Sequence, residues 1–123
     1  MRVLLIDDDM NVRNVVSKML RRAGFAVVEG ENGLRGVTLL KANPVDLVLT
    51  DMVMPVMDGI EFIKTARQLN PLLKVIAMSG GGRTCNMDHL QAAREVGACA
   101  TLQKPFTSRD LLSSIQQCLA GGA

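Results

Sequence analysis

The sequence predicts an α/β protein with a doubly wound, five-stranded parallel sheet and five helices. Two observations lead to this prediction: short, continuous apolar runs recur along the chain, and segments with helical periodicity separate them. A regular alternation of strand and helix is typical of a parallel sheet whose right-handed crossovers place helices on both faces.

Five apolar runs are predicted to form the strands. None of them alternates between polar and apolar residues as a half-exposed strand does, and such runs suit strands that are buried on both faces. The runs occupy residues 3–6, 26–28, 47–49, 75–78 and 99–102.

The segments that follow these runs are predicted to be helices. Apolar residues repeat at spacings of three and four in the first and last segments, which indicates one buried stripe on each helix. These stripes consist of Val12, Val15, Val16, Met19 and Leu20, and of Leu111, Leu112, Ile115, Cys118 and Leu119. A shorter stripe in the fourth helix consists of Met87, Leu90, Ala93 and Gly97. The segments 33–42 and 59–69 are also expected to be helical, although Thr38 and Thr65 interrupt their stripes.

Residues with strong positional preferences support these boundaries. Gly24 and Gly97 follow helical segments as C-terminal stops. Asn43 and Asn70, each followed by a proline, close two other helices. Thr107 is expected to cap the N-terminus of the last helix.

Composition and charge exclude several classes of protein. The 123 residues, of which 48% are hydrophobic and 21% are charged, suffice for one core of ordinary size. The net charge of +2 comes from scattered residues, and a longest basic run of Arg21-Arg22 is too short for a nucleic-acid footprint. No apolar run approaches the ~20 residues of a membrane span. Asp7 follows the first apolar run too closely for a signal peptide.

We therefore expect one soluble, cytoplasmic domain. Residues 1–120 are expected to form it and residues 121–123 to be a short tail, with no output domain. The three cysteines, Cys85, Cys99 and Cys118, show no metal-ligand spacing. In a cytoplasmic protein we expect them to be reduced thiols.

Polar side chains follow every predicted strand, at the edge where ligands bind to an open α/β sheet. These positions hold Asp7-Asp8-Asp9, Glu29-Gly30-Glu31, Thr50-Asp51, Ser79 before Gly80-Gly81-Gly82, and Gln103-Lys104-Pro105. If the first strand lies beside the third, one pocket contains Asp7, Asp8, Asp51, Ser79 and Lys104.

Such a pocket has the groups that phosphoryl transfer to a carboxylate requires. Crowded carboxylates hold a cation, and oxygen ligands without His or Cys favour Mg²⁺ or Mn²⁺. One carboxylate can then act as the nucleophile, which gives an aspartyl phosphate. The cation, the Lys104 ammonium and the Ser79 hydroxyl can hold the phosphoryl oxygens, and Gly80 has no side chain to block the approach.

Four segments at strand ends resemble the motifs of the receiver domains of two-component response regulators. They read Leu-Ile-Asp-Asp-Asp at 5–9, Val-Leu-Thr-Asp-Met-Val-Met-Pro-Val-Met-Asp-Gly at 48–59, Ala-Met-Ser-Gly at 77–80 and Gln-Lys-Pro-Phe at 103–106. The four occur in the order typical of the family, and the resemblance covers essentially the whole chain. It implies a flavodoxin-like fold of the receiver type and a role in phosphorelay signal transduction.

This resemblance implies a role for each residue of the acidic cluster. Asp51 is the phospho-acceptor. Asp7 and Asp8 hold Mg²⁺ together with Asp51 and the backbone carbonyl of Val53.

The resemblance also assigns Ser79 and Lys104. Ser79 is the switch hydroxyl that moves onto the phosphoryl group, and Lys104 is the ammonium that pairs with this group. The family further implies a cis bond between Lys104 and Pro105, which would aim the Lys104 side chain inward.

Partners and output follow from the same resemblance. A sensor histidine kinase or a histidine phosphotransfer protein supplies the phosphoryl group and docks on residues 11–20 and 106–109. Phosphorylation then changes the binding of a downstream protein to the face within residues 83–119 that carries Thr101, Phe106 and Arg109. The protein is expected to catalyse only its own phosphorylation and dephosphorylation and to bind neither nucleic acid nor membrane.

Two departures from the family pattern affect these expectations. Receivers often have an aromatic residue in place of Thr101, and a threonine cannot report phosphorylation by swinging a ring. Polar side chains often tune hydrolysis at the positions of Val53 and Gly81, and neither residue can orient a water molecule. The sequence therefore predicts slow intrinsic dephosphorylation.

The alternative from another class is a Mg²⁺-dependent phosphohydrolase of the haloacid-dehalogenase type, with an aspartate nucleophile. Asp7-x-Asp9 superficially fits its opening motif. Against it, position 11 is Asn where that family has Thr or Val. The acid that follows Lys104 is Asp110, inside the last helix, in place of an acidic pair at a strand end. A phosphorylation-independent adaptor is also disfavoured, because the acidic site is intact.

Other features have plain structural interpretations. Asp9 suits a helix N-terminus, where acids stabilise the dipole. Asp58-Gly59 suits a turn followed by a helix cap, and His89 is expected on the surface. Three methionines either fill gaps around the site or form an adaptable docking surface: Met52, Met54 and Met57.

Overall fold

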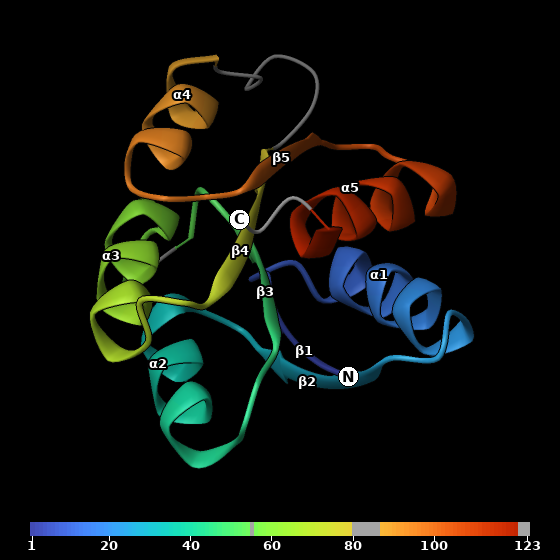
Figure 1. Ribbon diagram of the computed structural model, residues 1–123, viewed down its shortest axis with the longest axis horizontal. Helices are drawn as coiled ribbons and strands as arrows, with labels where there is room; N and C mark the ends of the chain where they lie inside the picture. Colours follow the sequence, from blue (N-terminus) through green and yellow to red (C-terminus); the bar gives the residue numbers. More distant parts are fainter. Residues whose placement is uncertain (55, 80–86, 121–123) are drawn as a thin grey trace.

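The computed structural model describes residues 1–54, 56–79 and 87–120, although the side chains of residues 87–90 are outside that description. Strands and helices alternate along the chain (Figure 1). They are β1 (Arg2–Ile6), α1 (Met10–Arg22), β2 (Ala26–Gly30), α2 (Gly33–Ala42), β3 (Leu47–Asp51), α3 (Gly59–Leu69), β4 (Lys74–Ser79), α4 (Met87–Glu95), β5 (Ala100–Gln103) and α5 (Ser108–Ala120). The predicted fold is confirmed. The domain boundary at residue 120 stays a prediction, since residues 121–123 lie outside the description.

The strands form one parallel sheet in the order β2-β1-β3-β4-β5. β1 therefore lies beside β3, which is the arrangement that the predicted pocket requires. In register, Ile6 is opposite Thr50, and Asp51 is opposite Met78. The residues that follow neighbouring strands are thereby brought together at one edge of the sheet.

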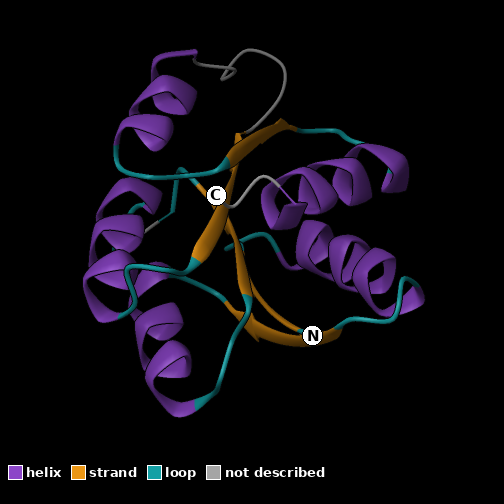
Figure 2. Ribbon diagram, in the orientation of Figure 1, coloured by secondary structure: helices purple, strands orange, loops and turns teal. Residues whose placement is uncertain are grey.

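Helices cover both faces of the sheet. Figures 1 and 2 show α1 and α5 on one face and α2, α3 and α4 on the other. Because successive strand residues point to opposite faces, Val3 and Leu5 join the core beneath α1 and α5, while Leu4 and Ile6 join the core beneath the other helices. Burial on both faces explains why the strands are continuous apolar runs.

Helix ends agree with the predicted boundaries. Gly24 and Gly97 have φ angles of 94° and 112°, in the left-handed region where glycine is not penalised. Asn43 and Asn70 are the C-caps of α2 and α3. Gly97 itself lies beyond α4, which ends at Glu95, so it belongs to the turn rather than to the helical stripe.

Three threonines satisfy the backbone of the helices that contain or follow them. Thr38 and Thr65 each donate a hydroxyl hydrogen to the carbonyl oxygen four residues earlier, at 3.3 and 3.0 Å. Each hydroxyl thus has an acceptor within its own helix, so the polar side chain is tolerated where it interrupts the apolar stripe. Thr107 caps α5, since the N–H of Asp110 donates to its hydroxyl and its own N–H donates to the Asp110 carboxylate, both at 3.1 Å.

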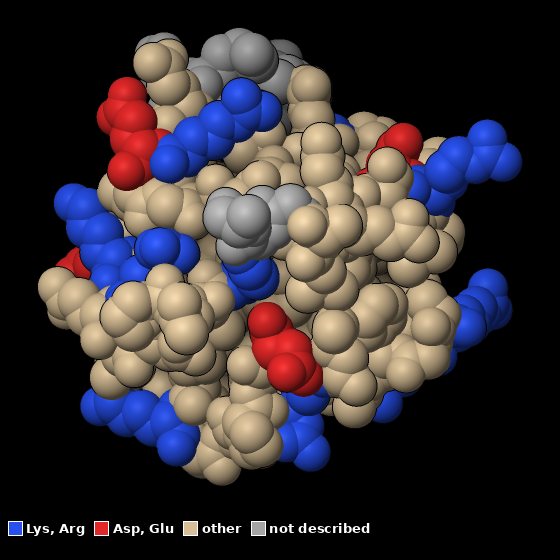
Figure 3. Space-filling view, viewed as in Figure 1, with Lys and Arg blue, Asp and Glu red and all other residues tan. Residues whose placement is uncertain are grey.

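Charged side chains are scattered over the surface. On the face shown in Figure 3, Lys and Arg side chains lie both at the outline of the molecule and nearer the centre of the face, and they do not gather in one patch. Within the described parts of the chain, every helix is too short or too polar to cross a membrane.

The expectation of three reduced thiols is wrong for two of the cysteines. Cys99, just before β5, and Cys118, in the last turn of α5, form a disulfide, with Cα atoms 5.7 Å apart. The 19-residue separation gave no sign of this pairing. It depends on how α5 packs back across β5, which is a tertiary feature. Cys85 lies outside the described residues.

Val56, in the loop between β3 and α3, has an unfavourable backbone conformation. Its φ angle is 73°, in the left-handed region that β-branched residues rarely adopt. The residue is 74% exposed, so packing offsets little of this cost.

Replacing Val56 with asparagine is expected to stabilise the protein. Asparagine tolerates the left-handed conformation, so Val56→Asn should raise the free energy of unfolding by about 1 kcal/mol. Urea denaturation in Mg²⁺-free buffer measures the change. Val53→Asn is the matched control, because Val53 is exposed in the same loop and has no positive φ angle. Equal effects of the two substitutions would contradict the strain at Val56.

Candidate functional site

Three strand ends bring a lysine and two buried aspartates together. Asp7 follows β1 and is fully buried, Asp51 ends β3 and is 6% exposed, and Lys104 follows β5. The Lys104 Nζ atom lies 2.7 Å from Asp7 Oδ2 and 3.3 Å from Asp51 Oδ2. One ammonium group thus bridges two carboxylates from neighbouring central strands.

The other oxygen of each carboxylate accepts a backbone hydrogen bond. Asp9 N–H donates to Asp7 Oδ1 at 2.9 Å, and Met52 N–H donates to Asp51 Oδ1 at 2.8 Å. Each buried carboxylate therefore has a partner on both oxygens. This is the condition under which a buried charge is tolerated.

The electrostatic environment shifts the pKa values of two of these groups. Burial raises the pKa of Asp51, and the negative charge of Asp7 adds to this effect, while Lys104 and the Met52 N–H oppose it. Burial alone would lower the pKa of Lys104, but the hydrogen bond to Asp7 and the charges of Asp51 and Asp7 outweigh it and raise this pKa. Lys104 is therefore held firmly in its charged form.

Three carboxylates converge as a candidate metal site. Asp7, Asp8 and Asp51 each offer an oxygen, and these atoms lie within 4.8 Å of one another. Asp8 is exposed, so the cluster opens to solvent on that side. Three negative charges beside the single Lys104 ammonium leave an excess of negative charge. All-oxygen donors with such an excess fit a hard divalent cation.

Ser79 lies at the same edge of the sheet. It ends β4, is 2% exposed, and is opposite Gln103 in β5. Its carbonyl oxygen accepts a hydrogen bond from Lys104 N–H at 2.8 Å, which joins the ends of β4 and β5. The Lys104–Pro105 bond is cis, as the resemblance implied. Gly80, Gly81 and Gly82 lie outside the described residues.

The loop after β3 is shaped by a cap and a close approach. Asp58 caps α3 and accepts a hydrogen bond from Glu61 N–H at 2.9 Å, as predicted. At Gly59, a Cβ atom would lie 2.7 Å from the Cα atom of Met52, so a larger residue would displace the loop. Met52 and Met54 are buried in the core and Met57 packs against it, which favours the gap-filling interpretation.

Asp9 has a structural role, as expected. It is the N-cap of α1, and its carboxylate accepts hydrogen bonds from Asn11 N–H at 2.9 Å and Val12 N–H at 3.4 Å. The three consecutive acids therefore have two different roles: Asp7 and Asp8 face the pocket, and Asp9 caps the N-terminus of α1.

Sequence reasoning missed Arg13, which supports the pocket from α1. Its Nη1 donates to the carbonyl oxygen of Asp7 at 2.8 Å, and its Nε lies 3.3 Å from a carboxylate oxygen of Glu29 at the end of β2. Arg13 thus ties the loop that carries the acids to β2. Glu29 stood out as a strand-end acid, but no motif connected it to an arginine on the first helix.

The three predicted switch residues lie apart from the carboxylates. Thr101, on β5, accepts a hydrogen bond from Arg94 Nη2 of α4 at 3.3 Å. Phe106 is half-buried against the core beneath α1 and α5, and Arg109 is exposed at the start of α5. The side chain of His89 lies outside the description.

An apolar groove adjoins the site. It has a volume of about 470 Å³ and lies between α1 and the segment after β5. Its lining consists of Asn11, Val12, Val15, Val16, Met19, Lys104, Pro105 and Phe106.

Comparison with known proteins gives a consistent result. A family model described as the response regulator receiver domain matches residues 3–116. The response regulator receiver protein CpdR of Brucella abortus (strain 2308) is 36% identical over 118 residues, or 96% of each chain. Sporulation initiation phosphotransferase F of Bacillus subtilis (strain 168) is 29% identical over 96% of this chain and 93% of its own. The crystal structure of a CheY-like receiver domain protein from Methanospirillum hungatei JF-1 superposes with a TM-score of 0.89 at 27% identity, over 98% of this chain and 94% of that one.

These similarities span nearly the whole chain and agree with the pocket. The haloacid-dehalogenase alternative is not supported. Its opening motif would need Asp9 in the pocket, where the carboxylate is instead engaged as a helix cap. The chain belongs to the response regulator receiver domain family and is a receiver of two-component signal transduction.

Proposed function

We propose that Asp51 is the phospho-acceptor and that a sensor histidine kinase or a histidine phosphotransfer protein supplies the phosphoryl group. Receiver domains of this family are phosphorylated by such donors. The observation that carries the proposal is the contact of Lys104 with both Asp51 and Asp7. It positions an ammonium group beside the carboxylate, where the negative oxygens of a phosphoryl group need a partner.

The transfer moves the phosphoryl group from a histidine nitrogen to an oxygen of Asp51. We assign Oδ2 as the nucleophile, because it lies on the side of Lys104 while Oδ1 accepts the Met52 N–H. The receiver family is a signalling family, not one of classical enzymes. Catalysis by this chain is confined to forming and hydrolysing its own aspartyl phosphate, in the cytoplasm.

The proposed cofactor is Mg²⁺, held by Asp7, Asp8, Asp51 and the backbone carbonyl of Val53. The mutual proximity of the three carboxylate oxygens supports this ligand set. A bound Mg²⁺ offsets the negative charge of the phosphoryl group and the carboxylates. Asp8 is the ligand most readily tested, because it is exposed and no described hydrogen bond or ion pair uses its side chain.

Ser79 and Lys104 are proposed to report phosphorylation to the α4–β5–α5 face. Movement of the Ser79 hydroxyl onto the phosphoryl group would act on β5 through the hydrogen bond between Lys104 N–H and the Ser79 carbonyl. In β5, Thr101 bonds Arg94 of α4. We infer that this polar contact takes the place of an aromatic switch, and that a downstream protein binds at this face near Phe106 and Arg109.

The phosphoryl donor is proposed to dock on α1 and the segment after β5, over residues 11–20 and 106–109. The apolar groove supports this surface, because it lies beside Lys104 and is lined by the exposed Val15 and the half-buried Phe106. A partner helix that fills the groove would bring its histidine close to the pocket.

Replacement of Asp51 tests the phospho-acceptor. Wild-type protein incubated with acetyl phosphate and Mg²⁺ should gain one phosphoryl group by intact mass, and Asp51→Asn should gain none. Asp58→Asn is the matched control, because asparagine keeps the cap of α3 and should label normally. A label that persists in Asp51→Asn and disappears in Asp7→Asn would move the nucleophile to β1 and revive the hydrolase alternative.

Substitutions at two neighbouring aspartates, Asp8 and Asp9, distinguish a metal ligand from a helix cap. Asp8→Asn should weaken Mg²⁺ binding at least about tenfold, because a carboxylate ligand is lost while the fold is untouched. Asp9→Asn should bind Mg²⁺ as the wild type does, since asparagine also caps a helix. Isothermal titration calorimetry measures both affinities. Equal weakening by the two substitutions would rule out the proposed ligand set.

Hydrolysis of the aspartyl phosphate should be slow because Val53 cannot orient a water molecule. Val53→Asn should shorten the lifetime of phospho-Asp51 several-fold, measured by intact mass after removal of the phosphoryl donor. Val56→Asn makes the same chemical change three residues further along the exposed loop and should have little effect. A wild-type half-life of only seconds would contradict this prediction.

A further inference from the structure

We propose that Cys99 and Cys118 form a reversible thiol–disulfide couple, that Cys99 is the sulfur which reacts, and that the hollow beside it accepts an anionic low-molecular-weight thiol such as glutathione. This site goes beyond the proposed function. It lies at the amino end of β5, whereas Lys104 and the carboxylates lie at the opposite, carboxyl edge of the sheet.

The two sulfurs differ in access. Cys99 is exposed in the turn before β5, whereas Cys118 is 3% exposed and belongs to the core beneath α1 and α5. Thiol–disulfide exchange requires an attacking thiolate to reach one sulfur. Only Cys99 offers that approach, so Cys118 is the leaving sulfur.

The surface next to Cys99 provides room and charge for the attacking molecule. A hollow of about 490 Å³ lies between α4, β5 and α5, and Cys99 is part of its lining. Arg94, Ser114 and Gln117 line the same hollow. A guanidinium group with neighbouring hydroxyl and amide groups suits a ligand that carries carboxylates, and glutathione has two.

Reduction of the disulfide consumes two molecules of glutathione. A glutathione thiolate attacks Cys99 Sγ and forms a mixed disulfide, the bond to Cys118 breaks, and the Cys118 sulfur takes a proton. A second glutathione thiolate attacks the mixed disulfide and releases Cys99 as a thiol. The products are the protein dithiol and glutathione disulfide, and the reverse sequence restores the bond.

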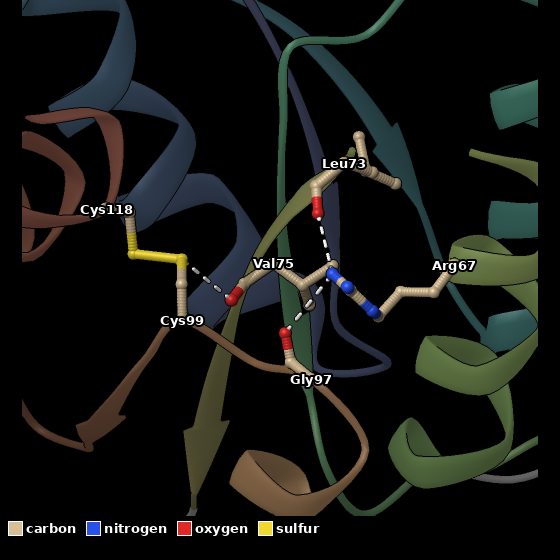
Figure 4. Close-up of a disulfide and its surroundings, with 6 residues drawn as sticks. All are labelled: Arg67, Leu73, Val75, Gly97, Cys99 and Cys118. Carbon is tan, nitrogen blue, oxygen red and sulfur yellow. Dashed lines mark hydrogen bonds between the residues drawn. A yellow bond between two sulfur atoms is a disulfide. The ribbon is translucent and has the colours of Figure 1, made fainter. Parts of the chain in front are cut away.

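Both redox states have suitable surroundings. The carbonyl oxygen of Val75 accepts the Cys99 N–H at 2.8 Å. The same oxygen lies 3.3 Å from Cys99 Sγ (Figure 4). A thiol hydrogen on Cys99 would therefore find an acceptor in place. A neutral Cys118 thiol would remain among Leu111 and Ile115, where a free cysteine packs as a small apolar residue.

Reduction is expected to loosen α5 rather than the turn before β5. Arg67 of α3 donates from Nη1 to the carbonyl oxygens of Leu73 at 3.1 Å and Gly97 at 3.4 Å (Figure 4). Together with the Cys99 N–H bond to Val75, these contacts hold the turn whether or not the disulfide is present. The covalent link to Cys118 is therefore an additional constraint on the last turn of α5.

The couple is better explained as reversible than as a structural staple. A chain with a core on both faces of a sheet does not need a disulfide to fold. In the cytoplasm, which is the location under the proposed function, the glutathione pool reduces disulfides and keeps thiols reduced, so the disulfides that do form there are transient or redox-sensing.

Alkylation after equilibration with glutathione tests the pairing. The full chain treated with glutathione disulfide should show one alkylated cysteine, Cys85, and after reduced glutathione it should show all three, by peptide mapping. In the Cys85→Ser variant, glutathione disulfide should abolish alkylation of both Cys99 and Cys118, and reduced glutathione should restore it. Three alkylated cysteines under oxidising conditions, or a disulfide that contains Cys85, would overturn the proposal.

Single-cysteine variants test which sulfur reacts. With glutathione disulfide, Cys118→Ala should form a mixed disulfide at Cys99 at least tenfold faster than Cys99→Ala forms one at Cys118, because apolar burial hinders attack. Arg94→Gln should slow reduction of the wild-type pair by glutathione several-fold but not by 2-mercaptoethanol, which is neutral. Arg35→Gln is the matched control, because Arg35 is exposed on α2, on the face of the sheet opposite α5 (Figure 1), and it should slow neither reaction. Equal rates at the two sulfurs, or no effect of Arg94→Gln, would overturn the assignment of the site.

Hydrogen exchange of the wild-type protein tests the structural consequence without any substitution. Reduction should speed exchange in the last turns of α5 at least tenfold and leave β4 unchanged. Unchanged hydrogen exchange in α5 would contradict the expectation that reduction loosens this helix. Labelling of Asp51 by acetyl phosphate should be equal in both redox states. Failure of the redox proposal would therefore change the alkylation and exchange results, whereas failure of the phospho-acceptor proposal would change the labelling of Asp51.

Discussion

The bridge from Lys104 to Asp7 and Asp51 is the interaction on which the rest of this structure depends. Two buried carboxylates repel each other, and the desolvation of each costs several kcal/mol unless its charge is compensated. Lys104 and one backbone N–H per carboxylate provide the compensation. Because the three side chains follow β1, β3 and β5, the bridge exists only if the strand order places β1 beside β3 and if β5 closes the sheet on the correct side.

The edge strand β5 connects the chemistry to the surface. At its carboxyl end, Lys104 contacts the carboxylates and its N–H joins the end of β4. At its amino end, Cys99 is linked to α5. Among the described strands β5 pairs with β4 alone. Lys104 fixes its carboxyl end, and the hydrogen bond from Cys99 N–H to the Val75 carbonyl holds its amino end. A change in charge at the acidic pocket therefore acts on β5, and a change in covalent linkage at the opposite edge acts on α5, so both reach the α4–β5–α5 face.

Local features of the sequence anticipated much of the fold. α2 and α3 formed where expected, and Thr38 and Thr65 are tolerated within them, since each hydroxyl bonds a carbonyl of its own helix. The convergence of Asp7, Asp51 and Lys104 could also be predicted, since parallel strands place their carboxyl ends at one edge. The role of Arg13 could not be predicted from the sequence, because its contacts with the Asp7 carbonyl and Glu29 depend on how α1 packs across β1 and β2.

The alternation of strands and helices, the helix caps and the acidic pocket could all be predicted from the sequence. These are properties of spacing and residue type over short stretches of chain. Three other features follow from the folded protein: the strained conformation of Val56, the contacts of Arg13 and the Cys99–Cys118 disulfide. Each of these depends on the distance between segments that are remote in sequence or on the path of a loop. Burial on both faces of a parallel sheet sets those distances, and no short-range pattern encodes them.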